Sequence, residues 1–352
     1  MTKQRVSALL TSSVVVAAGV SIILHPQEIS AAVLVSLSLC GNTLLPTLFP
    51  FFVLSSLVIK LDLFRPLTRC MEGFMETLFH LPGQCASALV LGLIGGYPSG
   101  AKTAAELYRN GLCSKEEAEN LLSFCNNCGP AFLFGAVGCG IFGGAKYGLL
   151  LTGVHDTAAL LTGVLLNRCG KCTYMKPQRP YSGPVPLSAA FVDSVTEAIG
   201  AMLNLCSFVL CFGAITRLLT LSGLPRLAAD LFLPFLTPQS GENLLLGLLE
   251  MTQGITALSS EPLPVRLILT AALLGWGGVS VHCQVLGLLR DIDLNLKRYL
   301  QGKLLHSIIS AALMWGVLYH VDLTCLTAGG ALLILPRICC KKSSGKSTKG
   351  IV

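Results

Sequence analysis

Two neighbouring stretches decide the fold of this chain: GLIGGYPSGAKTAAELYRNGLCS at residues 92–114 and LLSFCNNCGPAFLFGAVG at residues 121–138. The apolar run 84–96 is shorter than the roughly 20 residues that cross a bilayer, and it ends in a Gly/Pro cluster that turns the chain. Because non-helical backbone at membrane depth must be buried in protein or line a wet cavity, residues 84–109 are predicted to form a re-entrant helical hairpin. Residues 126–130 interrupt the apolar stretch 120–145 and predict a broken span made of two half-helices.

The second half of the chain repeats this order of elements. A short apolar run, Leu244 to Leu249, precedes the polar turn Glu250 to Gly254, so residues 242–260 predict a second re-entrant hairpin. Residues 265–289 are long enough to cross, and they are interrupted at 275–280. The sequence identity between the two halves is weak. The prediction of a repeat therefore depends on the shared order of span, hairpin, broken span and span.

The composition places these elements in a lipid bilayer. Of the 352 residues, 53% are hydrophobic and only 12% are charged, whereas soluble proteins carry roughly 25% charged residues. Soluble globular and disordered proteins are both excluded on these figures. The net charge of +7 comes from Lys and Arg that do not gather on one polar face, so no nucleic-acid partner is expected. The 15 Cys lie mostly in apolar runs as packing residues, and no metal site is expected.

The distribution of basic residues predicts the topology, because cytoplasmic loops are rich in Lys and Arg. The N-terminus, residues 168–179, residues 290–303 and the tail after residue 335 carry this excess and are predicted to be cytoplasmic. About eight crossings satisfy the pattern, and we expect the first to remain uncleaved. They run over about 6–24, 44–59, 119–142, 146–166, 188–220, 265–289, 304–321 and 322–337. Both termini are then inside, and the hairpins at 84–109 and 242–260 enter from the inside and the outside respectively.

The predicted fold is therefore an all-α polytopic membrane protein with two inverted repeats. Residues 1–43 form a first span and an interfacial or tilted helix, 44–166 the first repeat, and 167–187 a basic cytoplasmic loop. Residues 188–321 form the second repeat, and 322–352 a final span with a basic tail. Inverted repeats with broken helices are typical of secondary transporters, whose site lies near the midplane between the repeats.

Candidate site residues lie at the four interruptions. Glu250, beside Thr252 and Gln253, is a candidate solute ligand or proton-coupling carboxylate, because charge at membrane depth is costly; the alternative is a solvated loop. Tyr97, Ser99, Gly100 and Lys102 surround the start of a half-helix whose free N–H groups favour an anion. Alternatively, Lys102 only caps the helix or reaches the interface. These two hairpin tips are the first candidate half of the site.

The two broken spans supply the remaining candidates. Asn126 and Asn127 are placed either to bind a solute or to satisfy the orphaned backbone of the break. Ser280, His282 and Gln284 follow the second break, where the histidine is either a proton shuttle or a packed, hydrogen-bonded group. The sequence holds no nucleophile elbow, HExxH or Walker A motif. No enzymatic activity is therefore expected.

The two opening stretches, together with LLPTLFPFFVLSSL at 44–57, carry a family likeness. They resemble the nucleoside-recognition (Gate-domain) membrane proteins, and within them the sporulation integral membrane proteins of the YlbJ type, over roughly residues 30–321. The resemblance implies a fold related to the concentrative nucleoside transporters. In such a fold the site forms from two hairpin tips and two unwound helices. These map here to 97–102, 126–129, 250–254 and 277–284.

The resemblance also implies a role in endospore formation. The activity implied is movement of dipicolinate, a small planar dianion, in the cell membrane or the outer membrane of the forespore. One alternative is a nucleoside carrier coupled to Na⁺ or H⁺, with no other cofactor. A second alternative is a non-transporting membrane scaffold of spore assembly. Assembly into a homo-oligomer stays open.

Overall fold

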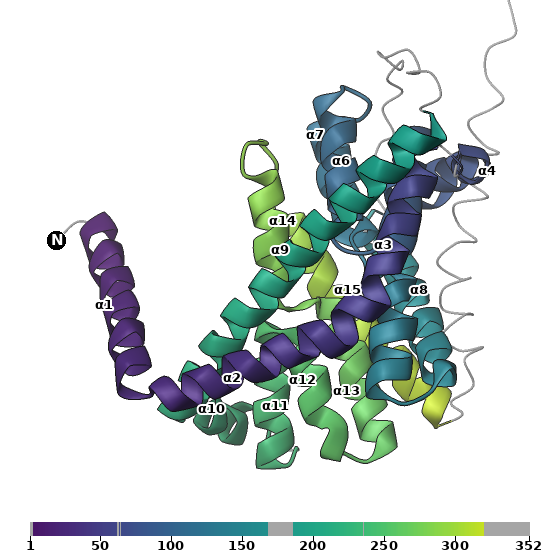
Figure 1. The fold of residues 1–352 in the computed structure, drawn as a ribbon. Coiled ribbons are helices and arrows are strands. Elements are labelled where there is room, and N and C mark those ends of the chain that lie inside the picture. Colours follow the sequence, from purple (N-terminus) through teal and green to yellow (C-terminus); the bar gives the residue numbers. More distant parts are fainter. Residues whose placement is uncertain (1–2, 62, 64, 168–185, 235, 320–352) are drawn as a thin grey trace, which may run out of the picture.

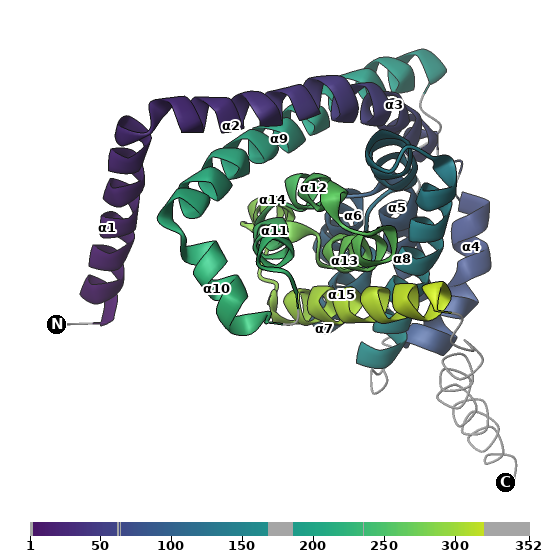
Figure 2. The same ribbon diagram turned by 90° about the horizontal axis from the view of Figure 1, so that it is seen from below.

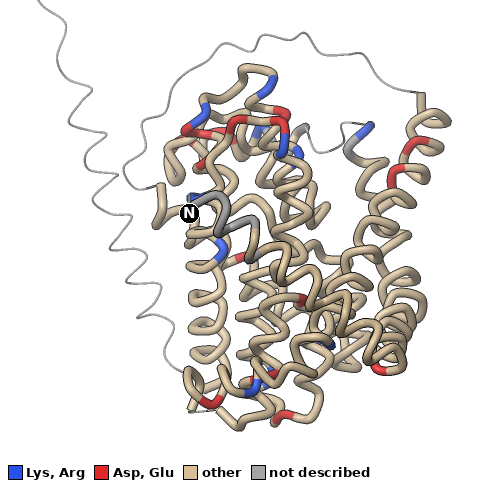
Figure 3. The backbone as a smooth tube through the Cα atoms, turned by 90° about the vertical axis from the view of Figure 1, so that its left-hand side faces the viewer, with Lys and Arg blue, Asp and Glu red and all other residues tan. Residues whose placement is uncertain are grey.

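The computed structural model describes residues 3–61, 63, 65–167, 186–234 and 236–319, and all regular elements in these ranges are helical. Within them, four helices are long and apolar enough to cross a membrane, namely 26–58, 145–166, 187–222 and 263–289. A pair bent by 109°, 69–79 with 83–95, adds a fifth if it is counted as one span. Charged residues lie mainly at the two ends of the bundle (Figure 3). The predicted span 322–337, the basic loop 168–179 and the C-terminal tail lie outside the described residues.

Two long helical segments cross along one side of the molecule (Figure 2). The first follows α1 (Lys3–Leu24) and joins α2 (Pro26–Leu39), the π-helix η1 (Cys40–Leu44) and α3 (Leu45–Lys60). The second is α9 (Leu187–Ser222), which leads into the short helix α10 (Leu224–Phe232).

The predicted break between an interfacial or tilted helix over 30–42 and a separate span over 44–59 is absent from the structure. Residues 26–58 form one continuous apolar helix. The wide π turn at Cys40–Leu44, where the backbone N–H of Leu45 donates to the carbonyl of Cys40, lets the helix continue through Pro46 and Pro50. The predicted boundary at residue 43/44 therefore falls inside a helix.

The first half contains the predicted hairpin and broken helix. Its elements are α4 (Arg65–Phe74), η2 (Met75–Phe79), η3 (Gly83–Cys85), α5 (Ala86–Gly95), α6 (Ser99–Arg109), α7 (Lys115–Cys125), η4 (Ala131–Ile141) and α8 (Ala145–Leu166). The hairpin turns between α5 and α6, where Gly96 has a φ of 72° that favours glycine. Helix α7 begins at a capping box formed by Ser114 and Glu117. It ends before the extended residue Asn126, and η4 resumes after Pro130.

The second half follows the same order. Its elements are α11 (Pro238–Leu249), α12 (Met251–Ala257), η5 (Leu258–Ser260), α13 (Leu263–Trp276), α14 (Gly278–Leu289) and α15 (Lys297–Leu318). The hairpin turns at Glu250, and α13 ends at Gly277, whose φ of 90° interrupts the span where the sequence predicts. The connection after α6 lies at the upper end of the bundle and those around α11 and α12 at the lower end, so the hairpins enter from opposite ends (Figure 1).

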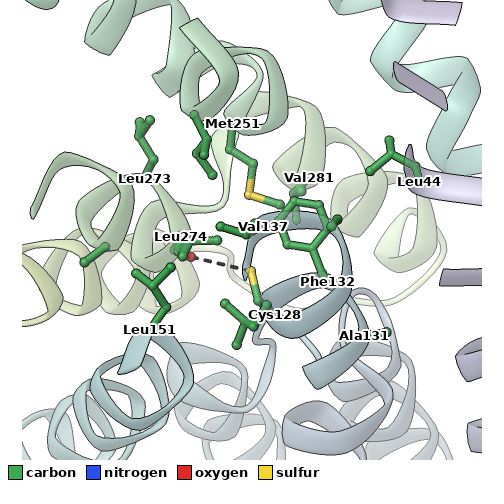
Figure 4. Close-up of a cluster of buried hydrophobic side chains, with 14 of the residues drawn as sticks. Leu44, Cys128, Ala131, Phe132, Val137, Leu151, Met251, Leu273, Leu274 and Val281 are labelled. Atoms are coloured by element: carbon green, nitrogen blue, oxygen red, sulfur yellow. Dashed lines mark hydrogen bonds between the residues drawn. The ribbon is translucent and has the colours of Figure 1, made fainter. Parts of the chain in front are cut away.

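The apolar core lies where the two halves cross. Cys128 from the first break and Phe132 from η4 pack in one cluster with Met251, Leu274 and Val281 from the second half (Figure 4). The Cys128 thiol lies 3.9 Å from the carbonyl oxygen of Leu274. This packing holds the two breaks and the two hairpin tips next to one another.

Candidate functional site

The four interruptions meet in two pairs with direct backbone contact, and the side chain of Tyr97 joins the two pairs. A Cβ added at Gly96 would lie 2.8 Å from the backbone N of Gly129, so the first hairpin tip touches the first break. A Cβ added at Gly278 would lie 3.1 Å from the backbone N of Met251, so the second break touches the second tip. The Tyr97 hydroxyl donates to the carbonyl of Leu274 at 3.3 Å and joins the two halves. Glycine is needed at these contacts because any side chain would separate the segments.

A small cavity of about 50 Å³, the central cavity, lies among these interruptions. Five of the predicted site residues line it: Tyr97, Glu250, Thr252, Ser280 and Gln284. They come from both hairpin tips and from the second broken span, so the structure gathers residues that are up to 187 positions apart (97 to 284). The other lining residues are Leu48, Phe52, Ser55, Ile94, Gly95, Gly96, Gly129, Ala131, Phe132, Leu205, Val209, Met251 and Val281. The cavity is thus apolar with a few convergent polar groups, as small-molecule sites usually are.

Glu250 is the most constrained residue of the central cavity. Its side chain is 2% exposed and caps the N-terminus of α12. One carboxylate oxygen accepts from the backbone N–H of Thr252 at 3.2 Å and the other from that of Gln253 at 2.7 Å. These bonds and the positive end of the half-helix stabilise the carboxylate in the protein interior. Among the described residues that line this cavity, no other carries a formal charge.

Two larger cavities lie on either side of the central cavity. We name the first, about 340 Å³, the Lys102 cavity; it is lined by Phe52, Ser55, Ser56, Leu91, Gly95, Tyr97, Pro98, Ser99, Lys102, Thr103, Glu106, Glu197, Ala198 and Ala201. We name the second, about 760 Å³, the Arg217 cavity; it is lined by Gln27, Glu28, Ala31, Ala32, Val35, Leu39, Gly213, Thr216, Arg217, Thr220, Asn243, Leu246, Gln253, Gly254, Thr256 and Ala257.

The long helices place the three cavities in line. Along α9, residues 197–201 line the Lys102 cavity, 205–209 the central cavity and 213–220 the Arg217 cavity. The segment α2–η1–α3 lines the same three in reverse chain order. From 197 to 220 the helix rises about 35 Å, which is close to the thickness of the hydrocarbon core. The three cavities therefore follow one another along both long helical segments.

Gln253 lines the Arg217 cavity, next to Thr252, which lines the central cavity. Its side-chain amide donates to the Ser36 hydroxyl at 3.0 Å and to the Val209 carbonyl at 3.2 Å. Its amide oxygen accepts from the Thr216 hydroxyl at 3.4 Å. These bonds tie the second hairpin to both long helices. Gly213 leaves room for the arrangement, because a Cβ there would lie 2.1 Å from the Ser36 hydroxyl.

Three predicted residues of the first hairpin lie away from the central cavity. Ser99 and Lys102 line the Lys102 cavity, where Lys102 is exposed and shares the wall with Glu197. Gly100 is buried against α7, since a Cβ there would lie 2.0 Å from the carbonyl oxygen of Cys125. Because the helix begins at Ser99, the side chain of Lys102 lies at the cavity wall, and that of its neighbour Ala101 lies inside the protein.

The remaining predicted residues hold the breaks together. The Asn126 carboxamide oxygen accepts from the backbone N–H of Ala101 at 3.4 Å, and the Asn127 amide donates to the carbonyl of Phe124 at 2.8 Å. His282 is buried, with its Nδ1 2.8 Å from the Tyr299 hydroxyl and its ring edge-on to Trp276. None of these three lines the three cavities described above. The described residues also contain no group of three or more His, Cys, Asp or Glu placed to hold a metal ion.

Sequence reasoning misses Lys303, which it assigns to the basic loop 290–303. The helix α15 begins at Lys297, and Lys303 lies inside it with a 1% exposed side chain. Its ammonium donates to the Asn126 carbonyl at 3.0 Å and to the Tyr97 hydroxyl at 3.1 Å. The assignment is wrong because charge counting takes no account of the direction in which a helical side chain points.

A signal in the sequence could have identified Lys303. The buried residues of α15 that carry polar groups are spaced three or four residues apart on one helical face, and they are Tyr299, Lys303, His306 and Ser310. On α8, His155 belongs to the same network: its Nε2 accepts from the backbone N–H of Cys128 at 3.1 Å, and its ring centroid is 4.4 Å from that of His306. A polar stripe at helical spacing inside a span is typical of a buried functional network.

Two helical hairpins and two broken helices around a shared cavity, together with long apolar helices, define an integral multi-pass membrane protein with a transporter-like fold. The chain is similar to solved structures of CNTnw. A variant in two intermediate states matches with a TM-score of 0.51 and 13% and 15% sequence identity, over 89% of this chain and 86% of the other. A second variant, in an outward-facing state, matches with the same TM-score and coverage at 14% identity. At this identity the likeness concerns the fold alone.

The sequence comparisons give the family. Residues 42–170 match the Gate family model, described as nucleoside recognition. The chain is 30% identical over 350 residues to the sporulation integral membrane protein YlbJ of Bacillus subtilis (strain 168), covering 91% of this chain and 85% of the relative. The protein therefore belongs to the family of YlbJ-type sporulation integral membrane proteins.

Proposed function

We propose that the protein is a secondary transporter that moves a small polar or anionic solute along the path formed by the three cavities. The observation that supports this most is the order of those cavities along both α9 and α2–η1–α3. Gln253, held by hydrogen bonds to both long helical segments, is the proposed partition. A partition made by one hairpin tip can open when that hairpin moves, which is the requirement for alternating access. The central cavity, with Glu250 and five uncharged polar side chains, is then the solute site.

The proposed solute is dipicolinate, moved across the membrane around the developing spore during endospore formation. The family supports the setting, since the relative is named for sporulation. In the Lys102 cavity, the charges available to a dianion are Lys102 and the half-helix that begins at Ser99.

A nucleoside is the second candidate, and Glu250 favours it. A carboxylate accepts hydrogen bonds from hydroxyl groups but repels a dianion. The matched family model is also described as nucleoside recognition.

Uptake into sealed vesicles tests both candidates. Vesicles that contain the purified full-length protein are given radiolabelled dipicolinate or radiolabelled uridine, with protein-free vesicles as the baseline. We expect saturable uptake of dipicolinate above the baseline. Saturable uptake of uridine alone would replace the first candidate with the second. Uptake of neither, by protein that is folded and correctly inserted, would favour the third function, a membrane scaffold of spore assembly.

Substitution of Lys102 is expected to affect solute capture more than turnover. Lys102 is exposed, and it lines the Lys102 cavity and not the central cavity. Lys102→Ala should raise the apparent KM for dipicolinate by up to about five-fold, since an exposed charge pair contributes about 1 kcal/mol at most. Lys102→Arg should have a smaller effect because it keeps the charge but not the compact ammonium. Initial uptake rates against concentration measure this, with Lys60→Ala, which removes the partner of Glu197, as the control. An unchanged KM in Lys102→Ala would exclude Lys102 from capture.

The topology proposed with this function has eight crossings and two inverted repeats, 44–166 and 188–321. It places residues 168–181 and 338–352 in the cytoplasm, because Lys and Arg there have no acidic neighbours. Single cysteines introduced in each segment of a cysteine-free protein should react with a membrane-impermeant maleimide only after the membrane is opened. Labelling of either segment in intact cells would contradict the topology and the inverted repeat.

A further inference from the structure

Lys303 occupies a buried position that the packing of α15 fixes. A Cβ added at the adjacent Gly302 would lie 2.0 Å from the carbonyl oxygen of Ser123, so the backbones of α15 and α7 are in direct contact. This contact brings the side chain of Lys303 to the C-terminal end of α7. The ammonium lies 3.0 Å from the carbonyl oxygen of Asn126, 3.1 Å from the hydroxyl of Tyr97 and 5.2 Å from the centre of the Tyr97 ring.

The ammonium has no carboxylate partner in the part of the chain that the structure describes. No Asp or Glu of these residues lies within 4.0 Å of its nitrogen. The titratable groups that face it are Tyr97, Cys125, Cys128, His155, His282 and His306. A buried charge without a counter-charge is costly, so fixed dipoles must stabilise it.

The dipoles that stabilise Lys303 are those that bind metal cations in other broken helices. Asn126 caps the C-terminus of the half-helix α7, where unpaired carbonyls carry the negative end of the helix dipole. In transporters with discontinuous helices, unwound carbonyls and half-helix C-termini coordinate Na⁺ or accept protons. Here a lysine side chain fills that place.

We propose that Lys303 is a resident cation, which takes the position that a bound metal cation would occupy between the first break and the first hairpin tip. It ties Asn126 to Tyr97, and Tyr97 lines the central cavity. This cation position is therefore filled without Na⁺, and solute movement does not depend on a Na⁺ gradient. This inference rests on the proposed transport function and deepens it. Its test measures cation binding and not solute uptake, so the inference and the proposed function can fail independently.

Thermal unfolding of the purified full-length protein in lipid nanodiscs tests the inference. The midpoint is compared in NaCl and in choline chloride of the same concentration. We expect the same midpoint in both salts for the wild type. Lys303→Ala should unfold at a lower temperature in choline chloride and should recover roughly 5 °C in NaCl, because a bound ion stabilises the folded state by mass action. The gain should increase with Na⁺ concentration.

Two further variants keep the test decisive. Lys303→Arg retains a cation and should show no response to Na⁺. Lys146→Ala removes a lysine that also lies over a tyrosine ring, 4.9 Å from the centre of Tyr147, but at an exposed position, and it should show no response either. Stabilisation of the wild type by Na⁺ would overturn the inference, and so would equal midpoints of Lys303→Ala in the two salts. If Lys303→Ala cannot be purified in choline chloride, recovery of folded protein by NaCl or methylammonium supports the inference, and failure of both to recover it overturns it.

Discussion

Replacing Glu250 with Gln is expected to reduce solute uptake by about 10- to 100-fold while the protein stays folded. A hydrogen bond to a charged group contributes about 1.5–3 kcal/mol. Among the described residues that line the central cavity, Glu250 alone is charged. The folded state should lose roughly 1 kcal/mol, because the amide can still accept one of the two backbone N–H bonds that cap α12. If Glu250 carries a coupling proton, the pH dependence of any residual uptake should also flatten. Initial uptake rates and the unfolding midpoint are the measurements.

Glu242 provides the control for this substitution. It lies on the same hairpin with a side chain only 11% exposed, 3.9 Å from the guanidinium of Arg226, and it lines none of the three cavities described. Glu242→Gln should therefore leave uptake within about two-fold of the wild type, as expected for a weak ion pair. Native uptake with an unchanged pH profile in Glu250→Gln would remove Glu250 from the site and would favour a scaffold.

Gly92→Ala is expected to be the most destabilising single-methyl substitution in the first hairpin. Gly92 lies in α5 against the end of α7, and a Cβ there would lie 1.6 Å from the carbonyl oxygen of Cys125. No rotamer change can relieve this contact, because both sides of it are backbone. The helices must move apart, at a cost of about 3 kcal/mol or more. We expect a large loss of monodisperse protein in detergent and a lower unfolding midpoint in what remains.

Gly153 is the matched control, because it is also a helical glycine but has no atom within 4 Å of an added Cβ. Gly153→Ala should leave the midpoint unchanged or raise it slightly, since Ala is favoured over Gly in a helix by up to about 1 kcal/mol. Equal midpoints for Gly92→Ala and Gly153→Ala would mean that α5 and α7 are not in backbone contact.

The sequence predicts the interruptions well because local chemistry produces them. Gly96 and Gly277 adopt positive φ, and Pro130 cannot continue the hydrogen-bond pattern of a preceding helix. The same local reasoning fails at Pro46 and Pro50. There the π turn at Cys40–Leu44 keeps the helix continuous, and its stability depends on packing that the sequence pattern does not contain.

The site is predicted less completely, because its composition depends on which side of each half-helix faces the centre. Glu250 lines the central cavity because it lies at the turn itself. Lys102 lies one turn into its helix and faces the neighbouring cavity. Lys303 approaches the site from a helix some 200 residues away in sequence, 303 against 97, and only the crossing of α15 over α7 brings it there.

The small volume of the central cavity also determines how the fraction of protein with bound solute depends on the solute concentration. About 50 Å³ holds a few water molecules, whereas sites for drug-sized ligands measure about 300–1,000 Å³. A solute can therefore bind only to the fraction of molecules whose walls have separated, and its apparent dissociation constant exceeds the intrinsic value by the inverse of that fraction. Residues that hold the closed arrangement, such as Gln253, thereby weaken apparent affinity without touching the solute, and a substitution there would tighten binding by shifting the population of open molecules.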